Sequence, residues 1–439
     1  MSFVRISKLN ENSKNCDLHK VALFYNDYLY LKNEIKKITS GFFDNPALIT
    51  GKSILFKPNW VMHNKKQEDQ FCLRTNDALL LAAIDCVLEM NPLKVTIGDA
   101  PIQSCDWSGV VTENFLLAIE ALQKKYSVSI EIKDFRRTIF DPSKNNSINN
   151  KSAIDNYLIF DLGRNSNLEE ISSQKPTFRV TNYDPSRLAE SHMIGMHKYC
   201  ITKELFNNDV IISVPKIKTH QKTGITGALK NLVGLNGDKD FLPHHRVGGT
   251  GLGGDCYPGF NLLRRLSEFF LDHANKKIGK TLYWPFYYFS RLLWKISRPK
   301  AVHRLDAGWH GNDTCWRMVL DLNYIALCGK SDGSISSIPQ RQIYSLCDGI
   351  VGGEGDGPLD PKPLPMGIIS FSDNNAFNDC CMATLMGFDF QKIPLLKSAY
   401  LKEEPSSVNI FFNGKKINLE ELKKESVKAM PPHGWVGYL

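Results

Sequence analysis

The chain has 439 residues, enough for two or three domains and a large hydrophobic core. Hydrophobic and charged fractions of 42% and 23% are ordinary for a globular protein and exclude a wholly disordered chain. The formal charge of +8 is a weak signal for nucleic acid on a chain this long, so we expect no nucleic-acid partner. A charge of this size fits a small anion or an acidic surface equally well.

The 11 cysteines include no C-x-x-C pair, so zinc-ribbon and ferredoxin-type sites lack their ligand spacing. Their odd number in a long chain argues against a disulfide scaffold. The N-terminal segment MSFVRISKLNENSKN has no apolar stretch of the secretory type. We therefore expect a cytoplasmic protein with mostly free thiols.

The first part of the chain alternates strand and helix patterns. Short apolar runs predict strands at 53–56, 94–97 and 128–132, and apolar spacing predicts helices at 76–90 and 113–125. The order strand, helix, strand, helix, strand is typical of a parallel sheet with helices on its faces.

A second cycle of this kind begins near residue 209, with a strand at 209–215 and a helix at 223–235. We predict an α/β fold of two lobes, residues 1–205 and 206–439, each with a mostly parallel sheet flanked by helices and a cleft between them. A helical insertion is expected at about 259–330, followed by strands at 342–347 and 367–371 and a helix at 375–386. Within the insertion, residues 282–294 (LYWPFYYFSRLLW) are too short to span a membrane. We favour a buried helix pair or lid there over contact with a membrane surface.

A lysine-rich run, PKIKTHQKTGITGALKN, occupies residues 215–231. We expect it to turn from a strand into a helix at the carboxyl edge of the sheet, where open α/β sheets bind ligands. Free amide groups at the helix N-terminus would favour an anion there. The predicted substrate ligands of this run are Lys216, Lys218, Lys222, Thr223, Thr226, Lys230 and Asn231, and the alternative is a solvated basic surface.

Two further groups of polar residues follow predicted strands. Asp348, Glu354 and Asp356 lie among five glycines in CDGIVGGEGDGP, residues 347–358. Carboxylates this close repel one another unless a cation lies between them, which predicts Mg²⁺ or Mn²⁺, or contact with the lysines. Lys57 and Asn59 are predicted substrate ligands and Asp99 a further metal ligand, because both strand ends reach the same sheet edge. Solvated acids and ordinary loops are the alternatives.

His220 lies among the lysines and is the predicted general acid or base, with Asp348 and Glu354 as further catalytic residues. The positive charges near His220 would lower the pKa of its imidazole and favour the neutral form.

These motifs together resemble the family catalogued as domain of unknown function 362. The matching elements are Lys57-Pro58-Asn59, Gly98 to Pro101, residues 214–234, GNDTCWRMVLDLN at 311–323, residues 347–358 and Gly434-Trp435. Some members carry a ferredoxin-like cysteine motif that this chain lacks, so we expect no iron–sulfur cluster. The lobe pattern is also similar to that of lactate racemase-type proteins. The resemblance implies a fold and a site rather than a reaction.

The sequence thus predicts a cytoplasmic enzyme that acts on a phosphate- or carboxylate-bearing metabolite, with a divalent cation on the acidic run. The alternatives are a non-catalytic protein that binds such an anion, or a scaffold, and a membrane-surface enzyme that acts on a lipid-linked anion. The sequence indicates no particular oligomeric state.

Overall fold

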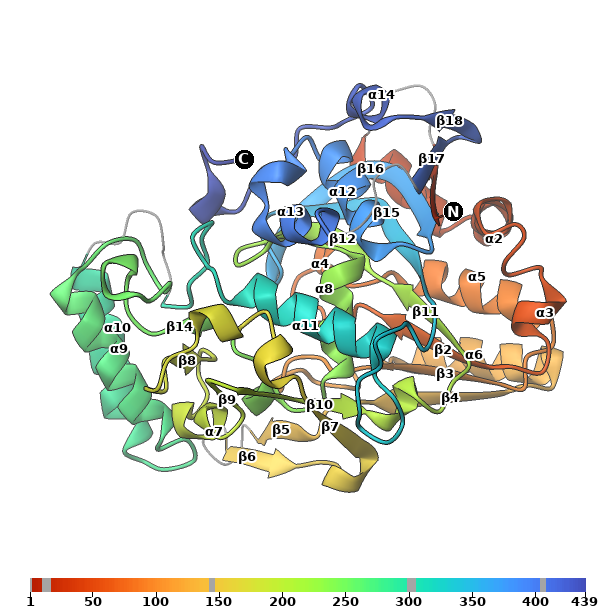
Figure 1. The fold of residues 1–439 in the computed structure, drawn as a ribbon. Coiled ribbons are helices and arrows are strands. Elements are labelled where there is room, and N and C mark those ends of the chain that lie inside the picture. Colours follow the sequence, from red (N-terminus) through yellow and green to blue (C-terminus); the bar gives the residue numbers. More distant parts are fainter. Residues whose placement is uncertain (1, 10–16, 142–146, 298–304, 403–407) are drawn as a thin grey trace.

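The computed structural model describes residues 2–9, 17–141, 147–297, 305–402 and 408–439 (Figure 1). Within this part of the chain, eleven strands form one large sheet. They are β1 (Ser2–Lys8), β2 (Ser53–Pro58), β3 (Lys94–Asp99), β4 (Ser129–Asp134), β11 (Val210–Val214), β12 (Lys216–His220), β13 (Gly224–Thr226), β15 (Ile343–Asp356), β16 (Asp360–Ser372), β17 (Val408–Phe412) and β18 (Lys415–Ile417). The strand order is β18-β17-β1-β16-β15-β11-β2-β3-β4, and the pair β12 and β13 joins the sheet beside β15.

The sheet is mostly parallel, which confirms the predicted α/β class. Strands β15, β11, β2, β3 and β4 run parallel to one another, whereas β16 is antiparallel to both β15 and β1. The two predicted lobes do not have separate sheets, because β2 of the first pairs with β11 of the second, Ile54 opposite Val210. The apolar run in β11 is buried on both faces, so this strand occupies the middle of one sheet instead of starting a new one.

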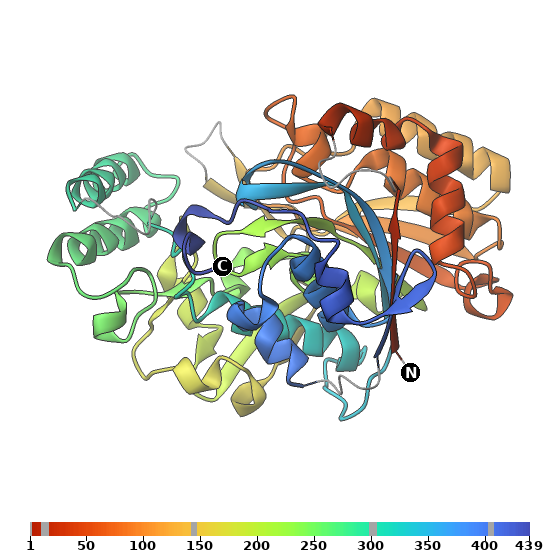
Figure 2. The same cartoon turned by 90° about the horizontal axis from the view of Figure 1, so that it is seen from above.

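Helices cover both faces of the sheet, as the view from above shows (Figure 2). On β2, Ile54 and Phe56 belong to one hydrophobic core and Leu55 to the other, because successive side chains of a strand point to opposite faces. The first core contains α1 (Leu18–Ala22), α2 (Tyr28–Ile38), α3 (Pro46–Ile49), α5 (Asp77–Leu88) and α6 (Glu113–Tyr126). The second contains α7 (Pro185–Ala189), α8 (Ala228–Asn231), α11 (Cys315–Cys328), α12 (Asn375–Leu385), α13 (Pro394–Tyr400) and α14 (Leu419–Lys423).

Smaller elements complete the fold. They are α4 (Asp69–Cys72), the hairpin of β5 (Thr138–Asp141) and β6 (Ser147–Asn150), the sheet of β7 (Tyr157–Asp161), β9 (His192–Met193) and β10 (Met196–Thr202), and the pair β8 (Phe178–Arg179) and β14 (His245–Arg246). The predicted helical insertion corresponds to α9 (Leu262–Asn275), α10 (Tyr283–Ile296) and α11. Helices α9 and α10 form a pair at one end of the molecule (Figures 1 and 2).

Several predicted elements are confirmed, one is wrong and one is longer than predicted. Helix α5 begins after Asn76, whose side chain accepts a hydrogen bond from the Ala78 amide at 2.9 Å. The helix predicted at 223–235 is instead strand β13, the short helix α8 and a 3-10 turn, because Gly224, with φ of +80°, lets the chain fold back on β12.

The strand predicted at 342–347 is longer than expected, since β15 continues through the acidic run to Asp356. Its glycines allow a close approach of β12: a Cβ atom on Gly353 would lie 2.7 Å from the Cβ of Lys218.

A candidate anion-binding site

A cavity of about 250 Å³ lies where the parallel strands end. Residues that follow β2 and β3, the β12–β13 hairpin, α8 and the chain next to β8 and β14 form its walls. The position agrees with the carboxyl sheet edge at which open α/β sheets bind ligands. Its charged and titratable lining residues are Lys218, Lys222, Lys230, Lys239, His220, His244, Tyr183, Asp99, Asp306 and Asp356.

Four buried polar atoms of cavity-lining residues have no hydrogen-bond partner among the described residues, and one of them is the Oγ1 of Thr181. The other three are the Nζ of Lys222, the Oγ1 of Thr226 and the Oδ1 of Asn59. A buried ammonium group without an acceptor is costly, and so is a buried hydroxyl group. An anion in the cavity would give Lys222 and Thr226 the acceptor that the protein does not supply.

The other lysines of the cavity have lowered pKa values. Burial lowers the pKa of Lys218 to about 7, and the charges of Lys216 and Lys230 contribute. Burial also lowers the pKa of Lys239, to about 8, and that of Lys230. The Nζ of Lys218 donates to the carbonyl oxygens of Leu73 and Pro358, the latter at 3.1 Å. The site therefore contains amines that change charge near neutral pH.

His220 is neutral in this environment. Burial, with Lys230 and Lys222 nearby, lowers the pKa of His220 well below its usual value. Its Nδ1 accepts hydrogen bonds from the backbone amides of Lys222 and Thr223, at 3.1 and 3.3 Å. The proton of the neutral ring is therefore on Nε2, so His220 can donate a hydrogen bond. A role as general base through Nδ1 is excluded by these contacts.

Lys57, Asn231 and Asp99 hold the strand ends together. The Nζ of Lys57 donates to Asp99 at 2.7 Å, and the side-chain amide of Asn231 donates to the Lys57 carbonyl oxygen at 3.0 Å. Asp99 also accepts from the amides of Trp60 and Ala100, at 2.7 and 2.8 Å. Asp99 and Asn231 line the cavity, whereas Lys57 is buried behind them.

Lys216 and Asp348 form a second buried ion pair outside the cavity. The Lys216 Nζ lies 2.8 Å from an Asp348 carboxylate oxygen, and both side chains are fully buried. The hydroxyl group of Tyr25 donates to Asp348 at 2.6 Å, and the Asn76 amide donates at 2.9 Å. Neither residue is therefore a substrate ligand or catalytic group of this cavity, contrary to the prediction, because each one's charge is neutralised by the other.

Glu354 and Asp356 contact the C-terminal segment. Glu354 accepts a hydrogen bond from the Met430 amide at 2.8 Å, and Asp356 from the His433 amide at 2.9 Å. Asp356 lines the cavity and Glu354 does not. The four predicted metal ligands, Asp99, Asp348, Glu354 and Asp356, thus have separate partners. Among the described residues, no three His, Cys, Asp or Glu side chains come together as metal ligands would.

The N-terminus of α8 is already capped by a carboxylate. Asp379 of α12 accepts from the amides of Ala228 and Leu229, at 2.7 and 2.9 Å. The expectation that free amides of this helix bind the anion is therefore wrong. Thr223 also has a local role, because its hydroxyl group donates to the Ile225 carbonyl oxygen at 3.1 Å and does not face the cavity.

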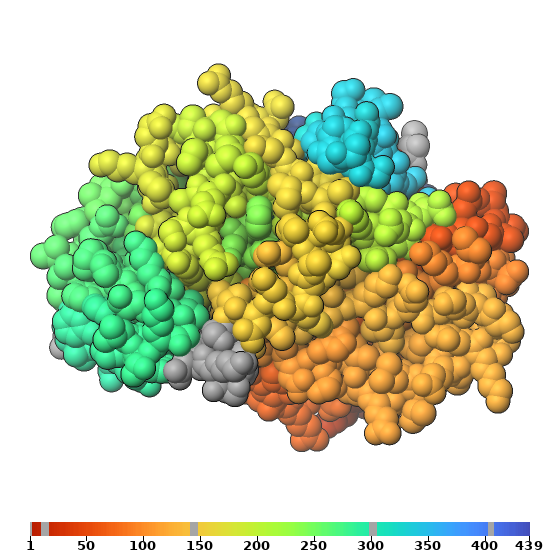
Figure 3. Space-filling view, turned by 90° about the horizontal axis from the view of Figure 1, so that it is seen from below, coloured from red at the N-terminus to blue at the C-terminus, as the bar shows by residue number. Residues whose placement is uncertain are grey.

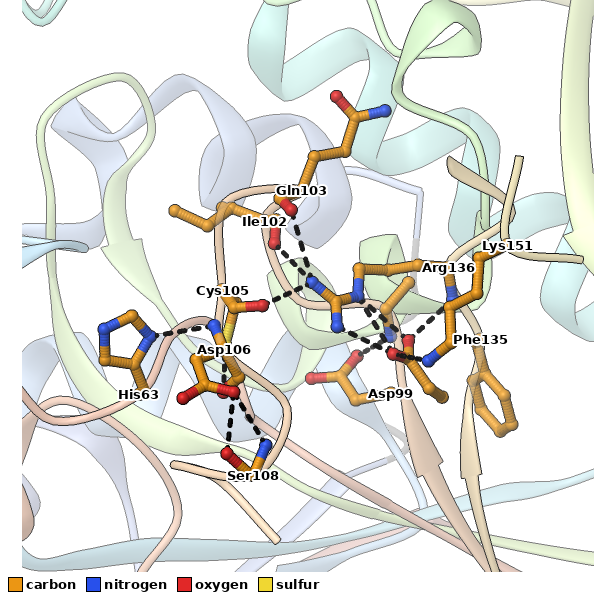
Figure 4. Close-up of polar contacts among 12 residues, drawn as sticks. His63, Asp99, Ile102, Gln103, Cys105, Asp106, Ser108, Phe135, Arg136 and Lys151 are labelled. Atoms are coloured by element: carbon orange, nitrogen blue, oxygen red, sulfur yellow. Dashed lines mark hydrogen bonds and ion pairs between the residues drawn. The ribbon is translucent and has the colours of Figure 1, made fainter. Parts of the chain in front are cut away.

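Two contributors to the site carry no sequence signal that we recognised. Lys239 donates to the Ala100 carbonyl oxygen at 3.2 Å, but it lies in a glycine-rich segment without a motif. Arg136 supports the chain after β3 by donating to the carbonyl oxygens of Ile102, Gln103 and Cys105 (Figure 4). Since Ile102 and Ala100 line the cavity, Arg136 fixes part of its wall from behind.

The comparison with protein families now decides the classification. The model of the family described as domain of unknown function (DUF362) matches residues 159–384, just over half of the chain. The chain belongs to this family. The match contains the β12–β13 hairpin, α8, Lys239 and His244, but not Asn59 and Asp99.

The other comparisons found little. No curated protein matches the chain. A solved structure of a Thermotoga maritima protein matches with 10% identity and a TM-score of 0.31, covering 76% of this chain and 53% of that one. The chain thus spans about half the length of that protein. Among the described residues, no helix is both long and apolar enough to cross a membrane.

Proposed function

We propose that the chain is an enzyme that acts on a small phosphate- or carboxylate-bearing metabolite held in this cavity. The observation that carries the proposal is the Lys222 ammonium group, buried on the cavity wall without a hydrogen-bond partner among the described residues. Three further lysines line the same space of about 250 Å³. This volume is below the usual range for drug-sized ligands and suits a small metabolite.

The proposed binding contacts follow from the side chains available. Lys222 and Lys230 would neutralise the anion through charge-assisted hydrogen bonds, which are about twice as strong as neutral ones. The Thr226 hydroxyl group and the Nε2–H of His220 would donate to other anion oxygens. The ion pair of Lys57 and Asp99 would keep the wall rigid rather than contact the ligand.

Lys218 favours catalysis over simple binding. With a pKa of about 7, its amine exists in both protonation states at neutral pH, which suits a general acid or base. A protein that only binds an anion gains nothing from a partly deprotonated lysine. We therefore assign proton transfer on the bound metabolite to Lys218.

A thermal-shift screen tests binding, and turnover tests the enzyme assignment. Phosphate, pyrophosphate and small carboxylates should raise the melting temperature, because a bound ligand stabilises the folded state. A wider panel of such metabolites, followed by ¹H and ³¹P NMR, should show turnover that Lys218→Met abolishes, whereas the anion should still bind, more weakly, through Lys222 and Lys230. Stabilisation without turnover of any compound would favour the binding-protein alternative. No stabilisation by any anion would refute both functions.

A further inference from the structure

The helix pair at the end of the molecule is built as a tight antiparallel hairpin (Figures 1 and 2), and this part of the chain forms one end of the molecule in the space-filling view (Figure 3). The hydroxyl groups of Ser267 in α9 and Ser290 in α10 each donate to the other residue's carbonyl oxygen at 2.8 Å. Tyr257, Leu271 and Trp294 belong to a small core of their own beneath it. The hairpin is thus held to the body on one side, and no described residue covers its other side.

The open side is a continuous apolar surface. Leu262, Leu266 and Phe269 repeat at helical spacing on α9, and Phe289, Leu292 and Ile296 do so on α10. These side chains are 39% to 62% exposed. Phe270 joins the two rows, because its ring lies 5.4 Å from that of Phe269 and 4.6 Å from that of Phe289. We call the six exposed residues of the two rows, without Phe270, the hairpin apolar face.

The exposed charges of this hairpin, residues 260–297, are all positive. They are Arg265, Lys276, Lys280, Arg291 and Lys295. The two acids are accounted for inside the structure: Glu268 is buried and accepts from the Gly248 amide at 2.7 Å, and Asp272 pairs with Arg179 at 3.0 Å. An exposed apolar face beside basic side chains, with no exposed acid, complements a negatively charged, apolar partner.

We propose that this hairpin docks the protein onto an anionic lipid bilayer. The apolar face would enter the boundary between headgroups and acyl chains, and the five basic side chains would contact lipid phosphates. A membrane fits better than a protein, because a bilayer offers both an extended apolar layer and a uniform negative charge. Each helix has 14 residues, so the hairpin would lie in the interface rather than cross it.

Vesicle co-sedimentation tests the apolar face. Wild-type protein should bind vesicles of phosphatidylcholine mixed with phosphatidylserine, and the double variant Phe269→Ser, Leu292→Ser should bind at least about tenfold more weakly. The matched control is Leu117→Ser with Ile338→Ser, two residues 57% and 65% exposed elsewhere on the surface. The control should bind as the wild type does. Circular dichroism would verify that both double variants are folded.

A second variant tests the charge. Lys276→Gln, Lys280→Gln and Lys295→Gln together should weaken binding to the anionic vesicles about tenfold or more and leave the weak binding to pure phosphatidylcholine unchanged. Absence of binding by the wild type, or equal loss in the control, would overturn the proposal. So would a wild-type dimer in ultracentrifugation that the Phe269 and Leu292 substitutions disperse, since a second copy would then cover the face. Vesicle binding needs no ligand in the cavity, so its outcome is separate from that of the proposed function.

Discussion

Lys216 and Lys222 lie six residues apart on one hairpin, but their ammonium groups have opposite surroundings. Lys216 is fully buried against Asp348 and Tyr25, whereas Lys222 has no hydrogen-bond partner among the described residues. A charge that is paired within the protein contributes to folding, and one left unpaired on a cavity wall is available to a ligand. Both belong to the same lysine-rich run, so it is the structure that separates the two roles.

Lys216→Met should destabilise the fold by about 3–5 kcal/mol, because Asp348 would remain as a buried charge without its partner. Chemical denaturation measures this loss. Lys222→Met should leave the free energy of unfolding unchanged or raise it, since it removes an unpaired buried charge. Equal destabilisation by the two substitutions would contradict the distinction.

Anion binding should weaken as the pH rises from about 6 to about 9. The pKa values of Lys218 and Lys239, about 7 and about 8, mean that the free protein loses these protons across that range. A bound anion stabilises the protonated amines and therefore raises both pKa values. Binding takes up protons at pH values between the pKa of each amine in the free protein and its higher pKa in the complex. Calorimetry with sulfate in buffers of different ionisation enthalpy measures this uptake, and Lys218→Met should reduce it. An affinity that rises with pH would rule out charged lysines as the ligands.

At the scale of elements, strands and helices could be predicted where one local pattern decided them. The apolar runs in β2, β3 and β11 and the Asn76 cap of α5 are such cases. The β12–β13 hairpin could not be predicted, because residues 223–235 also have helical spacing and the fold-back depends on Gly224. The cap of α8 comes from Asp379, about 150 residues away in the chain. Contacts at that separation leave no local signal.

The ion pair of Lys57 and Asp99, which joins the ends of β2 and β3, lies very close to the backbone of Gly234. A Cβ atom on Gly234 would lie 1.8 Å from a carboxylate oxygen of Asp99 and 2.7 Å from the Nζ of Lys57. Gly234→Ala should therefore displace this ion pair, destabilise the protein by about 1–3 kcal/mol and weaken anion binding. Denaturation and titration of the same variant measure both effects. A variant as stable as the wild type would show that the ion pair is not tightly constrained.

Glu354 on β15 provides a test of the predicted metal site. In the structure Glu354 accepts a hydrogen bond from the Met430 amide and lies outside the cavity. We therefore expect Glu354→Gln to lower stability by about 1–2 kcal/mol through the C-terminal segment, with the same effect in Mg²⁺, Mn²⁺ or chelator. Thermal unfolding under these three conditions measures it. Stabilisation of the wild type by either ion, lost in Glu354→Gln, would restore the metal prediction.

At the scale of the molecule, one sheet brings together residues that are far apart in the chain. The cavity wall includes Asn59, Lys230, His244 and Asp356, and the sheet places their segments at one edge. The sequence predicted this edge as the site because parallel strands end there. It did not predict which lysines would face the cavity, since that depends on which carboxylates pair with the others across the sheet.

The central claim is that Lys222 and its neighbours hold a small anion. Calorimetric titration with the most stabilising anion tests it most directly, in wild type, Lys222→Met and Lys415→Met, the last an exposed lysine on β18. We expect the affinity to fall at least about tenfold in Lys222→Met, the loss of one charge-assisted hydrogen bond, and to stay unchanged in Lys415→Met. Equal affinity in all three folded proteins would contradict the claim.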